Sequence, residues 1–307
     1  MAELVEGKTI ARRGSGAVRA VRRVARRARK RLRGRRAVVE ARMLGRRERR
    51  ATDSVLGTEP VVVSLTSYGS RIETVHLAIE SIARGTVRPA RMILWIDSPV
   101  DLLALPPALE RQKARGLEVL LATNYGPHTK YYPYVESQTR FTVPLVTADD
   151  DILYPADWLS GVMAANRAHP DSIVGYWIRR MCLDADGRPT AYTSWPYASD
   201  TRPHAANVAL GVSGVLYPTG MLDRLREQGD AFSSVAPYTD DLWLHAIALR
   251  SGVPVRQISG TPVHFLTLPG TQEVTLASEN LAGSGNDRVV AGLYSRADLE
   301  KVGGVGA

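Results

Sequence analysis

The chain has 307 residues, of which 44% are hydrophobic, and its formal net charge is +9. A chain of this length can bury the core of one large domain or of two smaller ones. The single cysteine, Cys182, excludes a disulfide scaffold and a zinc cluster built from cysteines. No apolar run approaches the ~20 residues that span a bilayer, and the N-terminus lacks the apolar core of a signal peptide. We therefore expect a soluble or membrane-surface protein.

The positive charge is concentrated at the N-terminus. Residues 1–50 contain 17 Arg and two Lys against four Glu, which is a formal charge of +15 and leaves the other 257 residues at −6. The sequence therefore predicts two parts, an Arg-rich extension over residues 1–58 and a globular domain over residues 59–307.

Apolar residues recur at helical spacing between the arginines of the extension. They are Val18, Val21, Ala25, Ala28, Leu32, Val39 and Met43. A basic helix with a narrow apolar stripe suits an anionic membrane surface, although nucleic acid would attract it for the same reason and a solvated extension is a third interpretation. The extension has no aromatic residue on which bases could stack, so nucleic acid is disfavoured. We expect a cytoplasmic protein held at the inner face of the cell membrane by residues 1–50.

From Pro60 onward, strand and helix patterns alternate. Strands are predicted over residues 61–65, 92–96, 117–121, 141–146, 172–178 and 253–258, and helices over residues 73–83, 108–115, 155–168, 221–228 and 242–250. This alternation predicts an α/β domain with a mostly parallel sheet, right-handed crossovers and helices on both faces.

Polar residues follow the first four predicted strands, at the sheet edge where ligands of open α/β folds gather. They are Thr66, Ser67, Asp97, Thr123, Asn124, Asp149, Asp150 and Asp151. The three adjacent aspartates would repel one another unless a cation neutralised them. Mg²⁺ and Mn²⁺ suit such a cluster, because they take one or two carboxylates and fill their other positions with water and phosphate oxygens. The alternative, an acidic cap on the helix near Pro155, needs only one aspartate.

A second acidic pair, Asp240 and Asp241, precedes an apolar helical segment. Aspartate in the first turn of a helix is stabilising, so a structural role explains one carboxylate. The other could be a general base.

Several isolated residues are ambiguous. His264 could complete a metal site as a neutral imidazole, although a lone histidine is more often a surface or core residue. The aromatic residues Tyr192, Trp195 and Tyr197 could stack on sugar rings, although packing in the core is their commoner role. The Asn286-Asp287 pair is explained as a helix cap.

Five motifs occur in a specific order, and each of them is weak alone. They are Val61–Tyr68 with Arg71-Ile72, Lys130–Tyr132, Ala148–Pro155, Gly211–Pro218 and Thr239–Leu244. Together they resemble a bacterial family 2-like group of glycosyltransferases with the GT-A fold, found among genes for capsular and other cell-surface polysaccharides. The resemblance runs from about Val61 to Asp287 and excludes the Arg-rich extension.

The resemblance implies metal-dependent transfer, with inversion, from a nucleotide-sugar donor such as a UDP-sugar to a hydroxyl of a glycan or lipid-linked acceptor. It places Thr66, Arg71, Asp97, Lys130, Asp149 and Asp150 at the nucleotide. It implies that Asp151, Asp149 and His264 hold Mn²⁺ or Mg²⁺, with the aspartates as a DXD motif. Asp241 takes the role of the base, with Asp240 as the second candidate.

Two other functions remain open from the sequence. A nucleotidyltransferase would also use clustered aspartates and a metal, but would release pyrophosphate. A nucleic-acid or membrane-surface binding protein would act through the basic extension and use the α/β domain as a scaffold.

Overall fold

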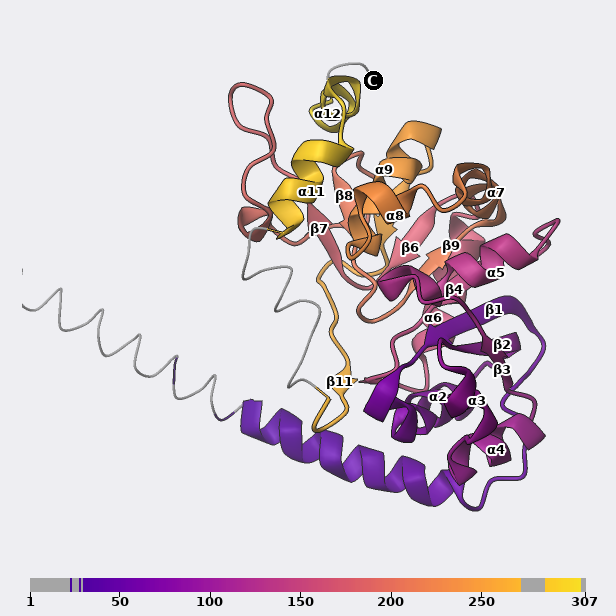
Figure 1. Ribbon diagram of the computed structural model, residues 1–307. Coiled ribbons are helices and arrows are strands. Elements are labelled where there is room, and N and C mark those ends of the chain that lie inside the picture. The colour runs from indigo at the N-terminus through magenta and orange to yellow at the C-terminus, as the bar shows by residue number, and fades with distance from the viewer. Residues whose placement is uncertain (1–22, 24–27, 29, 272–284, 305–307) are drawn as a thin grey trace, which may run out of the picture.

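A computed structural model describes residues 23, 28, 30–271 and 285–304 of the chain. Its central sheet consists of β1 (Glu59–Thr66), β2 (Pro89–Ile96), β3 (Glu118–Leu121), β4 (Leu145–Thr147), β6 (Ile173–Gly175), β9 (Val215–Tyr217) and β10 (Val255–Gln257). The strand order is β10-β6-β9-β4-β1-β2-β3, and β9 runs antiparallel to both of its neighbours while the other pairs are parallel. The predicted mostly parallel α/β sheet is confirmed (Figure 1).

Two antiparallel ribbons accompany the sheet. One pairs β5 (Ile152–Leu153) with β11 (Leu266–Thr267), and the other pairs β7 (Ile178–Arg180) with β8 (Asn207–Ala209). The helices are η1 (Gly69–Glu73), α2 (Val75–Ala83), α3 (Pro99–Leu103), α4 (Pro107–Ala114), η2 (Gly126–Lys130), α5 (Tyr132–Ser137), α6 (Trp158–Ala168), η3 (Tyr192–Ser194), α7 (Thr219–Gln228), α8 (Phe232–Val235), α9 (Asp240–Ser251), α11 (Gly285–Leu293) and α12 (Arg296–Val302).

Two predicted strands differ from the observed ones. The strand predicted over residues 141–146 begins only at Leu145, after Pro144, which has no N–H to donate to a neighbouring strand. The segment predicted as one strand over residues 172–178 divides into β6, which pairs in the central sheet, and the start of β7, which pairs with β8. An apolar strand pattern does not reveal such a change of partner.

The sheet is covered on both faces. In β1, Val61, Val63 and Leu65 pack with the cluster that contains the buried side chains of α2, α4 and α6, while Val62 packs with the cluster of α7 and α9. Successive side chains of a strand point to opposite faces, so the nearly continuous apolar runs of β1 and β2 match a sheet buried on both sides.

Residues 30–48 form a helix along one edge of the molecule (Figure 1). Its Leu44 packs with Leu153 and Leu268 of the domain, beside Leu77 of α2. The predicted division at residues 58 and 59 stays a prediction, but this helix is joined to the domain by packing. Within the described residues, no helix is long and apolar enough to cross a membrane.

Candidate active site

A cavity of about 510 Å³ opens at the carboxyl ends of the parallel strands. Its volume lies in the range of small-molecule sites, ~300–1,000 Å³. Nine of the ten predicted site residues line it, namely Thr66, Arg71, Asp97, Lys130, Asp149, Asp150, Asp151, Asp240 and Asp241. Thr66, Asp97 and the three adjacent aspartates lie together because the carboxyl ends of β1, β2 and β4 meet at one sheet edge. Arg71 comes from η1, Lys130 from η2, and the start of α9 adds Asp240 and Asp241 from far along the chain.

Arg71 holds two of the three adjacent aspartates. Its Nη1 lies 2.6 Å from Asp150 Oδ1 and its Nη2 lies 3.1 Å from Asp151 Oδ2. The Ser67 hydroxyl donates a further hydrogen bond of 2.7 Å to Asp150 Oδ2. Burial nevertheless raises the pKa of Asp150 to about 6, against the opposing effects of Arg71 and Ser67.

Lys130 lies between the two acidic groups. Its Nζ donates to Asp149 Oδ1 at 3.0 Å and lies 3.5 Å from Asp240 Oδ2. Burial would lower the pKa of Lys130, but the surrounding aspartates outweigh it and hold this pKa well above its ordinary value. The side chain is therefore a fixed positive charge in the cavity lining, between Asp149 and Asp240.

Asp241 has an unusual environment at the start of α9. The backbone N–H of Gly211 donates to its Oδ1 at 2.8 Å. Burial, together with the neighbouring charge of Asp240, raises the pKa of Asp241 well above its ordinary value, although Lys130 and Gly211 oppose the shift. A carboxylate with a raised pKa takes up a proton near neutral pH more readily than an exposed one, as a general base must.

The carboxylates of the cavity suit a divalent cation. Among the described lining residues, six aspartates face two cationic side chains, Arg71 and Lys130. A diphosphate would meet a net negative cavity unless another cation entered with it. Mg²⁺ and Mn²⁺ need only one or two carboxylates beside phosphate oxygens, so the residue types of Asp149 and Asp151 fit such an ion.

The structure does not bring His264 to these carboxylates. The imidazole lies outside the cavity lining, where its Nδ1 contacts Arg33 Nη2 at 2.6 Å and its ring packs edge-on against Trp177. Burial lowers its pKa. In the part of the chain that the structure describes, no group of three or more His, Cys, Asp or Glu side chains is arranged to hold a metal. A metal site in this cavity must therefore depend on the aspartates and on the ligand.

The sequence pattern explains Asn286 as a helix cap, but the structure also places it in the cavity lining. Asn286 and Thr239 line the cavity, and neither Asn286 Oδ1 nor Thr239 Oγ1, both buried, has a hydrogen-bond partner among the described residues. The adjacent Asp287 accepts a 2.7 Å hydrogen bond from the backbone N–H of Tyr192. Tyr192 lines the cavity, whereas Trp195 and Tyr197 do not.

Asn124 and Tyr238 also line the cavity, the first of them with its amide 2.6 Å from Asp97 Oδ2. The sequence pattern indicates Asn124 because it follows the third predicted strand. Tyr238, which is exposed, carried no such signal.

No protein-family model matches the sequence, and no curated protein matches it. Solved structures that are similar in part include the following three. The S. aureus TarS 1-349 fragment is 14% identical, with a TM-score of 0.45 over 65% of this chain and 58% of that one, so the match spans less than two thirds of that fragment. CMP:2-keto-3-deoxy-manno-octonic acid synthetase in complex with CTP is 10% identical, with a TM-score of 0.40 over 65% of this chain and 89% of that one. The 4-diphosphocytidyl-2C-methyl-D-erythritol synthase of Anaerococcus prevotii is 14% identical, with a TM-score of 0.45 over 71% and 94%. Likeness at these values assigns no activity to this chain, whose α/β fold with a mostly parallel central sheet is clear from its own strands.

Proposed function

We propose that the protein transfers a sugar from a nucleotide-sugar donor, a UDP-sugar, to a hydroxyl of a glycan or lipid-linked acceptor in the synthesis of a cell-surface polysaccharide. One observation carries this proposal: a single cation, Lys130, contacts both acidic groups of the cavity. Lys130 contacts Asp149 of the triple aspartate and Asp240 at the start of α9 in the same cavity. One acidic group is suited to the diphosphate end of a donor and the other to a reacting hydroxyl.

The nucleoside would lie near Thr66 and Asp97, at the ends of β1 and β2, which present hydroxyl and carboxylate groups to ribose and base. Arg71 and Lys130 would face the diphosphate, with Asp150 keeping Arg71 in position. Asp149 and Asp151 would hold Mg²⁺ or Mn²⁺. When bound, this ion stabilises the negative charge that develops on the leaving diphosphate.

The acceptor would approach from the side of α9. Asp241 takes the proton of the acceptor hydroxyl while that oxygen forms a bond to the anomeric carbon. The bond from the anomeric carbon to the donor phosphate oxygen breaks, and the nucleoside diphosphate leaves with the bonding electrons. This single displacement inverts the anomeric centre.

Two buried polar atoms support a ligand rich in hydroxyl groups. Thr239 and Asn286 are among the residues that line the cavity, and their buried Oγ1 and Oδ1 atoms lack partners among the described residues. A buried polar atom without a partner costs ~1–3 kcal/mol, and hydroxyls of a bound sugar would remove that cost.

Product analysis tests the proposal most directly. The purified protein would be incubated with a panel of radiolabelled UDP-sugars, with and without Mn²⁺, and with a lipid-linked glycan extract. Metal-dependent release of UDP together with a labelled glycan supports sugar transfer. Release of pyrophosphate from a nucleoside triphosphate and a sugar phosphate would instead identify a nucleotidyltransferase, because the same aspartates and cations suit that reaction. We place the reaction in the cytoplasm at the inner face of the membrane, with residues 1–50 providing the attachment.

A further inference from the structure

The helix over residues 30–48 has two faces of different character. Toward the domain it presents mainly small and apolar residues together with ion-pairing side chains. These are Ala37, Glu40, Ala41, Leu44, Arg47 and Glu48. Toward solvent it presents Leu32, Arg35, Arg36, Val39, Arg42, Met43 and Arg46, all of them exposed. The steps of three and four residues place each set on its own side of the helix.

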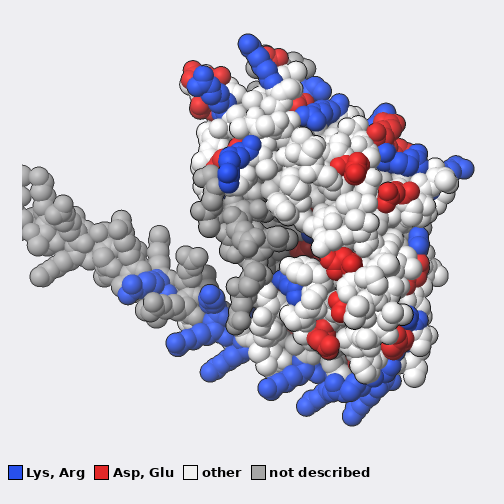
Figure 2. Space-filling model, in the orientation of Figure 1, with Lys and Arg blue, Asp and Glu red and all other residues white. Residues whose placement is uncertain are grey.

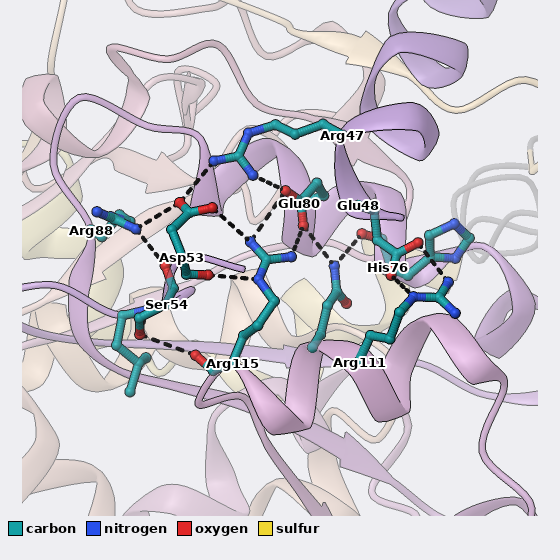
Figure 3. A network of polar contacts seen from close by, with 11 residues as sticks. Arg47, Glu48, Asp53, Ser54, His76, Glu80, Arg88, Arg111 and Arg115 are labelled. Atoms are coloured by element: carbon teal, nitrogen blue, oxygen red, sulfur yellow. Dashed lines mark hydrogen bonds and ion pairs between the residues drawn. The ribbon is translucent and has the colours of Figure 1, made fainter. Parts of the chain in front are cut away.

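Ion pairs keep the helix from turning about its axis. Glu48 is 1% exposed and receives two hydrogen bonds from Arg111, of 2.7 and 2.8 Å (Figure 3). Arg47 pairs with both Asp53 and the buried Glu80, and Glu80 also pairs with Arg115 at 2.7 Å (Figure 3). A rotation of the helix would leave buried charges without partners, which is strongly unfavourable. The outward face is therefore fixed relative to the domain.

The outward face combines charge with exposed apolar side chains. Leu32, Val39 and Met43 are 61%, 55% and 49% exposed, and arginines stand between them. Figure 2 shows a row of Lys and Arg side chains along the edge where Figure 1 places this helix. Single exposed apolar residues are ordinary, but three on one basic helix face form the pattern of an interfacial helix.

We propose that this face docks flat on an anionic lipid surface, with Leu32, Val39 and Met43 inserted among the acyl chains and the arginines at the lipid phosphates. The inference rests on the membrane attachment in the proposed function and deepens it, because a helix fixed to the domain by buried ion pairs holds the cavity in one orientation to the lipid. Nucleic acid would engage the arginines alone and would leave the three apolar side chains in water. The apolar residues therefore favour lipid as the partner.

Vesicle binding of the full-length chain tests this face without any donor or acceptor. The probe is sedimentation with vesicles of phosphatidylglycerol, compared with vesicles of phosphatidylcholine. One triple variant carries Arg35→Gln, Arg42→Gln and Arg46→Gln. The matched control carries Arg188→Gln, Arg202→Gln and Arg296→Gln, which removes the same charge from side chains that are 77%, 84% and 94% exposed elsewhere on the domain.

Each basic residue near anionic headgroups strengthens binding by about fivefold, so we expect the first triple to weaken binding to phosphatidylglycerol by ~100-fold. The control should change it by less than ~2-fold. A third variant, with Leu32→Ser, Val39→Ser and Met43→Ser, should lose the part of the binding that survives high salt, because salt screens charges and does not screen apolar insertion.

Three results would overturn the inference: equal losses in both arginine triples, equal binding of wild type to the two lipids, or an unchanged apolar variant. Binding of a double-stranded RNA that depends on the same arginines, with no vesicle binding, would assign the face to nucleic acid instead. Melting temperatures of all variants establish that they fold. Because vesicle binding needs no sugar transfer, a failure of the docking face and a failure of the proposed reaction give different results.

Discussion

The backbone N–H of Gly211 donates a hydrogen bond of 2.8 Å to Oδ1 of Asp241. A β-carbon at position 211 would lie 3.4 Å from that oxygen and 3.2 Å from Lys130 Nζ, so glycine permits this close approach. The bond holds the carboxylate at the start of α9, next to Asp240. It uses only Oδ1, so the carboxylate can still take a proton. An asparagine at position 241 could accept the same bond through its own Oδ1.

Asp241→Asn therefore separates catalysis from structure. If Asp241 is the base, we expect sugar transfer to fall by ~10²–10⁴-fold while donor affinity and melting temperature change little. If it only stabilises the helix dipole, the variant should lose up to ~1 kcal/mol of stability and keep its turnover. Transfer rate, donor affinity and melting temperature should be measured on one preparation.

Asp240→Asn is the matched control for that experiment. Asp240 is the neighbour in the same helical turn, and its carboxylate lies 3.5 Å from Lys130 Nζ. A loss of transfer in this variant alone would move the base to Asp240. Full activity in both variants would refute the assignment of the base to this pair.

We expect substitution of Asp151 and substitution of His264 to have different effects on the dependence of donor affinity on Mn²⁺. We expect Asp151→Ala to abolish the increase in donor affinity that Mn²⁺ produces, because the cavity would lose one of two carboxylates suited to the ion. The variant also deprives Arg71 of a partner, so the readout is the ratio of affinities with and without Mn²⁺, measured by calorimetry. His264→Ala should leave that ratio unchanged, since His264 lies outside the cavity lining. A ratio that survives in Asp151→Ala and disappears in His264→Ala would reverse both assignments.

Six of the seven strands of the central sheet, and polar residues at the ends of several of them, could be predicted from the sequence, whereas the strand order and the antiparallel β9 could not. Thr66, Asp97 and Asp149 each follow an apolar strand, and parallel strands place such residues at one edge. The cavity confirms that these residues lie together, although their roles remain proposals. Asp240 joins them only through the position of α9, which strand periodicity does not encode.

Pairings between distant side chains could not be predicted. Arg71 contacts Asp150, and Lys130 contacts both Asp149 and Asp240, so cations of the chain already neutralise part of the acidic cluster. Periodicity in a single sequence carries no information about such pairs. Opposite charges can meet wherever the fold brings them together.

The N-terminal helix shows a related limit. The apolar stripe predicted for a membrane surface includes Leu32, Val39 and Met43, which are exposed in the structure, while Val18, Val21 and Ala25 lie outside the described residues. The small Ala37 and the buried Leu44, which were not part of that stripe, face the domain. Small residues allow the helix to approach the domain closely, and arginine–glutamate pairs add to the contact. Hydrophobic spacing alone cannot distinguish a face that packs on the domain from a face left in solvent.

Glu80 tests how much the buried ion network stabilises the fold. Its side chain is fully buried and pairs with Arg115 and Arg47 (Figure 3). The side-chain amide of Gln112 donates a further hydrogen bond to it. We expect Glu80→Gln to reduce the free energy of unfolding by ~3–5 kcal/mol, because it removes the buried carboxylate that pairs with Arg115 at 2.7 Å and leaves Arg115 only the longer contact of 3.8 Å with Asp53. Urea unfolding measures the change. Glu227→Gln, at an exposed pair with Arg224, is the control and should cost no more than ~0.5 kcal/mol. Equal effects at the two sites would show that the network contributes no more than a surface pair.

The buried His245 should make the stability of the fold depend on pH. The ring is 3% exposed, with Nε2 2.8 Å from the Ala205 carbonyl and Nδ1 2.7 Å from the Tyr294 hydroxyl. Because a carbonyl only accepts, Nε2 carries the proton in the neutral ring and Nδ1 accepts from Tyr294. Burial lowers the pKa of His245 to about 4 from 6.5 in the unfolded chain.

Between those two values the unfolded chain binds the additional proton, so the contribution of His245 to stability is complete above pH 6.5 and is lost as the pH falls toward 4. The loss should reach about 2 kcal/mol at pH 5. Asp150 acts in the opposite direction, because its folded pKa of about 6 lies above the ordinary value of 3.8 and favours folding as the pH falls. Wild type must therefore be compared with His245→Gln, which keeps a donor and an acceptor but does not titrate. From pH 7 to pH 5, we expect the free energy of unfolding, measured in urea, to fall by about 2 kcal/mol more in wild type than in His245→Gln. The same pH dependence in both proteins would rule out His245 as its source.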